Sequence, residues 1–243
     1  PVFARAIARG EKLKAPLTEV FKRHGNQLIL GTFIMLATYC VFYLMSTWVL
    51  SYAIGKIENG YLGIPYREFL VLQLIAVLFF AAMVPVSGAL ADRFGRRPVL
   101  IVITLGIILF GLSFGTFLDP AIMGTGAGAN HKLMLLFLSV GMALMGLTFG
   151  PMSAILPELF PTNVRYTGSG ISYNLSSIFG AALTPFVAVW LTRDFGVAYV
   201  GYYLSALACL TLFSLLLARE TRHLDLETLE DQVSAVAIES TSP

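Results

Sequence analysis

The polar side chains best suited to contact a small solute lie inside long apolar stretches, and none of them carries a charge. Tyr39, Tyr43 and Thr47 recur at a spacing of four residues, which places them along one face of a helix. A tyrosine can donate a hydrogen bond to a carboxylate or stack against a quaternary ammonium. We interpret this stripe as a candidate lining of a solute pathway and add four further candidates: Gln73, Tyr173, Asn174 and Ser177.

Hydrogen bonding between neighbouring helices is the alternative role for each of these residues. Polar side chains in membrane helices contribute about 0.6–2 kcal/mol to helix association without touching a solute. The sequence leaves both roles open for each single residue, and it favours the pathway only for the stripe of Tyr39, Tyr43 and Thr47 taken together.

Three short segments between or after the apolar stretches, 88–98, 157–168 and 219–222, each combine acidic with basic residues. A basic membrane anchor would explain the arginines of the first segment, but not its aspartate and two glycines. On one side of the membrane, these charges would form an ion-pair network that biases a two-state equilibrium. The predicted members of this network, which we call the gate residues, are Asp92, Arg93, Arg96, Arg97, Glu158, Arg165 and Glu220.

The composition indicates which elements must position these residues. Of the 243 residues, 57% are hydrophobic and only 12% are charged, whereas soluble domains carry roughly 25% charged residues. A spanning helix needs roughly 20 apolar residues, and six stretches qualify. We predict an all-α membrane protein whose bundle (28–218) follows a linker (1–27) and precedes a tail (219–243), with spans at 28–54, 69–91, 98–118, 133–156, 168–191 and 196–218.

The basic residues predict the orientation of this bundle. Segments 1–27, 92–97, 157–167 and 219–243 together hold 12 Lys or Arg, and the three remaining connections hold 4. The positive-inside rule places the richer set, and with it both termini, in the cytoplasm. Trp48 and Trp190 are expected at the membrane interfaces. The motifs Gly111-x-x-x-Gly115 and Gly146-x-x-x-Gly150 predict close helix packing.

The charged segments carry a family resemblance. Gly88-Ala-Leu-Ala-Asp-Arg-Phe-Gly-Arg-Arg-Pro98 resembles the signature loop of the major facilitator superfamily. Pro157-Glu-Leu-Phe-Pro-Thr-Asn-Val-Arg165 and Arg219-Glu-Thr221 resemble the elements after its tenth and twelfth helices. The chain is most similar to the metabolite:proton symporters, which include carriers of shikimate, dicarboxylates, citrate and proline/betaine.

This resemblance implies the C-terminal half of a twelve-helix transporter in a bacterial inner membrane, with six helices missing before Pro1. It implies proton-coupled alternating access for a small organic carboxylate or betaine-like solute. The three histidines lie in loops, so a coupling group would belong to the missing half. The expected partners are the solute, the proton, the lipid bilayer and that half, with no nucleic acid, cofactor or metal.

Two further classes compete with a two-bundle carrier. A self-sufficient six-helix channel, or a half-carrier that forms a homodimer, would need no missing half, and the sequence leaves both open. An intramembrane enzyme would need a serine with a histidine, or a histidine-glutamate cluster, inside the spans. The spans offer neither, so we expect no enzymatic activity.

Overall fold

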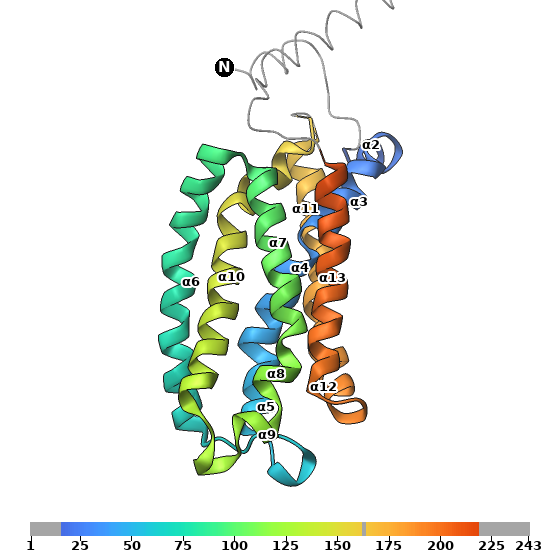
Figure 1. Cartoon of the computed structure of the whole chain (residues 1–243). Coiled ribbons are helices and arrows are strands. Elements are labelled where there is room, and N and C mark those ends of the chain that lie inside the picture. The colour runs from blue at the N-terminus through green and yellow to red at the C-terminus, as the bar shows by residue number, and fades with distance from the viewer. Residues whose placement is uncertain (1–15, 162–163, 219–243) are drawn as a thin grey trace, which may run out of the picture.

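The computed structural model describes residues 16–161 and 164–218, and these residues form helices without a strand. The segment expected at 28–54 is covered by several consecutive helices, and long helices lie over most of the other expected ranges (Figure 1). The first part of the chain contains α2 (Pro16–Arg23), α3 (Gly25–Ile34), α4 (Leu36–Tyr43), the π-helical turn η1 (Leu44–Trp48), α5 (Val49–Ile54) and α6 (Tyr66–Phe94). The second part contains α7 (Arg96–Leu112), α8 (Phe114–Leu118), α9 (Pro120–Met123), α10 (His131–Glu158), α11 (Arg165–Ser177), the π-helical turn η4 (Ile178–Ala182), α12 (Leu183–Asp194) and α13 (Val197–Leu217).

Five helical segments in the described part of the chain are long and apolar enough to cross a membrane. They are Gly25–Ile54, Tyr66–Phe94, His131–Glu158, Arg165–Asp194 and Val197–Leu217. The remaining expected span, 98–118, is divided at Ser113 between α7, which has 17 residues, and α8. The Ser113 hydroxyl donates to the carbonyl of Phe110 at 2.6 Å, and this local bond competes with regular helical pairing. The count of six spans therefore stays a prediction.

The two ends of the bundle differ in which elements they bring together. The end of α6, the starts of α7 and α11, and the end of α13 lie at one end of the bundle, beside α2 and α3 (Figure 1). The connections that contain α8 and α9, and the end of α12, lie at the other. The described helix ends that adjoin the segments 88–98, 157–168 and 219–222 thus lie at a single end of the bundle.

Small residues allow the long helices to approach one another. A Cβ atom on Gly146 of α10 would lie 3.0 Å from the Met83 Cβ and 3.1 Å from the Phe80 Cα of α6. A Cβ atom on Gly115 would lie 2.9 Å from the Ala198 Cβ of α13. All three distances are shorter than ordinary carbon contacts, which confirms the predicted packing role of the glycine motifs.

Trp48 corrects one expectation, because its side chain is only 1% exposed. Its ring stacks on Tyr52 at a centroid distance of 5.3 Å and on Phe114 at 5.9 Å, and its Nε1 donates to Thr192 Oγ1 at 3.2 Å. A partner inside the bundle satisfies the indole N–H, so the ring has no need of the membrane interface. Trp190, in contrast, is half exposed.

Large apolar side chains on the outer surface indicate which medium, lipid or water, surrounds the bundle. Leu74, Val102 and Phe186 are 68%, 69% and 76% exposed. They come from three different helical segments, so the apolar exposure is spread around the bundle. A surface of this kind is stable in lipid and costly in water.

Candidate functional site

A π-helical turn interrupts the first spanning segment close to the candidate stripe. In η1 the N–H of Val49 donates to the carbonyl of Leu44, five residues earlier. The extra residue in the turn displaces the regular donors, and π-turns of this kind are frequent at functional sites. Gln73 of α6 supplies a replacement donor, because its Nε2 lies 3.2 Å from the carbonyl oxygen of Met45 and 3.3 Å from that of Ser46.

A second π-helical turn, η4, lies in the segment that packs against the first. Its last turn is closed by a bond from the N–H of Leu183 to the carbonyl of Ile178. α4 packs on η4, and α12 packs on η1, so each irregular turn is covered by the other segment. A Cβ atom on Gly180 would lie 2.8 Å from the Tyr39 Cβ and 2.9 Å from the Leu36 carbonyl oxygen. Glycine therefore permits the close approach of these two segments.

Two tyrosines meet where α4 faces α11. The rings of Tyr39 and Tyr173 lie edge to face, with centroids 5.4 Å apart. The phenols interact electrostatically, but Tyr39 Oη is buried and forms no hydrogen bond of ordinary geometry with the described residues. Tyr173 is 51% exposed. This pair places a polar group with unused hydrogen-bonding capacity beside an open aromatic surface.

Ser176 adds a second polar group of this kind, which the sequence reasoning missed. It lies three residues after Tyr173 on the same face of α11, and its Oγ is buried without a hydrogen-bond partner among the described residues. A buried polar group without a partner is costly and asks for an explanation, such as a bound solute or water. The spacing from Tyr173 was the only signal that could have pointed to it.

The other predicted pathway residues differ in how far they are exposed. Tyr43 and Ser177 are half-buried, and Thr47 is exposed. Asn174 is also exposed, and its Nδ2 donates to the carbonyl of Gly170 in its own helix at 2.7 Å. The stripe of Tyr39, Tyr43 and Thr47 therefore runs from the buried Tyr39 hydroxyl towards an open surface.

An ion pair joins two predicted gate residues at the end of the bundle where α6, α10 and α13 end and α7 and α11 begin, which we call the charged end. Arg96 Nη1 pairs with Glu158 Oε1 and joins the start of α7 to the end of α10. The two side chains are 24% and 20% exposed, so the pair is partly shielded from water. Partial shielding strengthens the attraction relative to a pair on an open surface.

Arg97 joins the start of α7 to the end of α13. Its Nε donates to the carbonyl oxygen of Leu215 at 2.8 Å, and its Nη2 donates to that of Leu216 at 2.7 Å. The last carbonyls of a helix lack partners within the helix and carry partial negative charge. A guanidinium supplies both hydrogen-bond donors and a positive charge to these carbonyls. Arg96 and Arg97 together therefore connect the start of α7 with the ends of α10 and α13.

Three further gate candidates lie in the described part of the chain and differ in their contacts. Arg165 Nε donates to the carbonyl of Phe160 at 3.3 Å. Asp92 is exposed and forms no ion pair within the described residues, and Arg93 is exposed and lies over the ring of Phe94 at 5.2 Å. Glu220 lies outside the described residues. Within those residues, no group of three or more His, Cys, Asp or Glu could hold a metal ion.

Comparison with known proteins identifies related chains along nearly the whole sequence. The sugar (and other) transporter family matches residues 11–232. The inner membrane metabolite transport protein YhjE of Escherichia coli (strain K12) is 48% identical over 223 residues, which are 92% of this chain and 49% of that protein. A putative metabolite transport protein of Haemophilus influenzae is 43% identical over 93% of this chain and 51% of its own length.

A more distant relative carries a more specific name. The proline/betaine transporter of Salmonella typhimurium is 30% identical over 86% of this chain and 39% of its own length. No solved structure matches the chain. The chain spans about half the length of the curated relatives that it matches most fully. By sequence, this chain belongs to the sugar (and other) transporter family of the major facilitator superfamily.

Proposed function

We propose that this chain is the C-terminal six-helix half of a secondary active transporter that moves a small metabolite by proton-coupled alternating access. The observation that carries this proposal is the uncharged polar face of α4, η1 and α11. Its Tyr39 Oη and Ser176 Oγ atoms are buried and have no hydrogen bond of ordinary geometry with the described residues. A carrier must bind its solute weakly enough to release it, and isolated hydroxyl donors beside aromatic rings suit that task. The length relationship to the relatives supports a second bundle.

The solute class that fits this face is an organic carboxylate or a betaine-like zwitterion. Tyr39 Oη and Ser176 Oγ can each donate one hydrogen bond to a carboxylate oxygen. The half-exposed ring of Tyr173 offers a surface for a quaternary ammonium group, which aromatic faces attract. The names of the related proline/betaine transporters support the same class.

Proton coupling would require an ionisable group inside the membrane. The charged side chains of the described spanning segments lie at their ends, as Glu68, Asp92 and Glu158 illustrate. We therefore assign the proton-binding group to the N-terminal bundle. This places solute recognition partly, and proton binding wholly, outside the six helices of this chain.

The charged end of the bundle is proposed to form the cytoplasmic gate in a bacterial inner membrane, with both termini on that side. Arg96, Arg97 and Glu158 join helix ends of the same bundle, so these helix ends stay together when the two bundles move. Asp92 and Arg93 are exposed, so their side chains can contact the other bundle when the carrier faces outward. The gate would then open and close at the Gly88–Pro98 segment.

Whole-cell uptake of labelled proline, glycine betaine and small dicarboxylates tests this function. The full-length protein should accumulate at least one of these solutes, and a protonophore should abolish the accumulation. The 243-residue chain alone, present in the membrane at equal amount, should accumulate none. Uptake by the chain alone would support the channel or the homodimeric half-carrier instead. Uptake that ignores the protonophore would remove the proton from the mechanism.

A further inference from the structure

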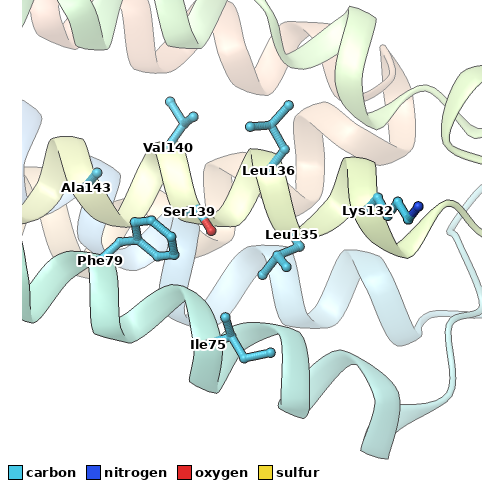
Figure 2. Close-up of a pocket in the computed structure, with 8 residues that line it drawn as sticks. All are labelled: Ile75, Phe79, Lys132, Leu135, Leu136, Ser139, Val140 and Ala143. Atoms are coloured by element: carbon cyan, nitrogen blue, oxygen red, sulfur yellow. The ribbon is translucent and has the colours of Figure 1, made fainter.

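An apolar groove of 480 Å³ runs between α6 and α10 on the surface of the bundle. Ile75 and Phe79 extend from α6 towards Leu135 and Ser139 of α10, and Lys132 lies at the end of the groove near the start of α10 (Figure 2). Apart from Lys132 and the Ser139 hydroxyl, the lining side chains are hydrocarbon. The complete lining is Ile75, Phe79, Lys132, Leu135, Leu136, Ser139, Val140 and Ala143.

The groove faces away from the proposed solute pathway. On the pathway side of α10, a Cβ atom on Gly141 would lie 3.0 Å from the Met45 Cγ, and Phe149 packs against Phe42 at a centroid distance of 6.5 Å. Leu136 and Val140 line the groove from the other side of α10, where they are 52% and 40% exposed. These side chains give that side of α10 an open apolar surface.

Two cations flank the end of the groove near the start of α10. Lys132 and Arg67 are both exposed, and neither forms an ion pair within the described residues. Arg67 directly precedes Glu68 in the first turn of α6. The nearby carboxylate of Glu68 faces His131, with Oε2 and Nε2 3.0 Å apart. The first turn of α6, which carries Arg67, therefore lies beside the start of α10, where Lys132 lines the end of the groove.

We propose that this groove binds an anionic phospholipid of the phosphatidylglycerol type. One acyl chain lies along Ile75, Phe79 and Val140, and the phosphate contacts Lys132 and Arg67. Each buried methylene favours such binding by the hydrophobic effect, and basic residues near the membrane surface attract anionic headgroups. The acyl chains of a zwitterionic phosphatidylethanolamine would fill the groove equally well. The negative charge of phosphatidylglycerol is therefore what makes the site prefer this lipid.

Native mass spectrometry of the full-length protein tests this assignment. The protein is released from nanodiscs that contain equal amounts of phosphatidylglycerol and phosphatidylethanolamine, and the retained lipids are counted. The wild-type protein should retain phosphatidylglycerol preferentially. Lys132→Gln should lower the ratio of retained phosphatidylglycerol to phosphatidylethanolamine by about fivefold. Lys56→Gln, which removes an exposed cation of the neighbouring loop after α5, should leave the ratio unchanged.

A second variant tests the apolar part of the site. Ala143→Phe places a ring in the groove and should lower the retention of both lipids, while Lys132→Gln lowers only that of phosphatidylglycerol. Equal retention of the two lipids by the wild-type protein, or an unchanged ratio in Lys132→Gln, would overturn the proposal. So would a protein dimer in the lipid-free spectrum that Ala143→Phe dissociates, because a second copy would then occupy the groove.

Discussion

The side-chain amide of Gln73 on α6 donates to the backbone carbonyl of Met45 at 3.2 Å, at the place where the π-helical turn η1 has displaced a regular helical donor. One long polar residue thus supports an irregular backbone in a neighbouring span. Gln73 was predicted as a pathway residue, and its geometry favours the alternative role, hydrogen bonding between helices. The irregular turn in turn sets the direction of the stripe around Tyr43 and Thr47.

Replacing Gln73 with Met should destabilise the protein, although the two side chains have similar volumes. The Met45 carbonyl would lose its donor, and an unsatisfied buried carbonyl costs about 1–3 kcal/mol. The midpoint temperature of thermal unfolding in detergent should fall accordingly. Leu74→Met changes the adjacent position, whose side chain is 68% exposed, and should leave the midpoint unchanged. Equal midpoints for the two variants would show that Gln73 does not support η1.

Removing the ion pair between Arg96 and Glu158 should destabilise the helix ends that lie beside the proposed gate. Glu158→Gln removes the charge that Arg96 faces, and we expect a loss of about 1 kcal/mol in the free energy of unfolding because the pair is partly shielded. The pair of Arg193 with Asp194 is the control, since the Arg193 side chain is 77% exposed. Asp194→Asn should have no measurable effect. A loss in Asp194→Asn as large as that in Glu158→Gln would contradict the argument from shielding.

The glycines at the α6–α10 contact provide a third test. Gly146→Ala would place a methyl group 3.0 Å from the Met83 Cβ and 3.1 Å from the Phe80 Cα, and overpacking of this kind costs about 1–3 kcal/mol. Gly170→Ala is the matched control, because no atom lies within 4 Å of a Cβ at that position. That change should be neutral or stabilise by about 0.5–1 kcal/mol. Denaturant unfolding of both variants gives the comparison.

Asp92→Asn should shift the carrier towards its inward-open state if the gate proposal is correct. A cysteine introduced at Ser153 reports this shift, because Ser153 is exposed on the face of α10 that carries Phe149, the side packed against α4. With Cys40 and Cys209 replaced by alanine, maleimide labelling at position 153 should become faster in Asp92→Asn. Glu68→Gln, at the opposite end of α6, should not change the rate. Unchanged labelling in Asp92→Asn would remove Asp92 from the gate.

Hydropathy predicted the helical character of the chain and the approximate position of its spans. It could not predict the two π-helical turns, because the sequences of residues 44–48 and 178–182 also suit a regular membrane helix. It also could not tell which side of a helix faces protein, since lipid and a protein interior accept the same side chains. The burial of Trp48 and the outward position of Leu74 therefore became evident only in the structure.

The charged end was less predictable than the spans. The sequence placed Asp92, Arg96, Arg97 and Glu158 at one end of the bundle, but spacing alone does not say which charge reaches which partner. Arg97 contacts the carbonyls of Leu215 and Leu216, and such a partner has no signature in the sequence. Ser176 was missed because the sequence does not tell which of two adjacent serines, Ser176 or Ser177, is buried inside the bundle.

Transport as proposed requires the face formed by α4, η1 and α11 to contact the solute. The Michaelis constant for uptake by Tyr39→Phe in the full-length protein tests this contact, because the change removes only the buried hydroxyl and keeps the ring. We expect the constant to rise about tenfold, the loss of one hydrogen bond to a charged group. Tyr199→Phe, a half-exposed tyrosine in the first turn of α13, should transport normally. A wild-type constant in Tyr39→Phe would contradict the account.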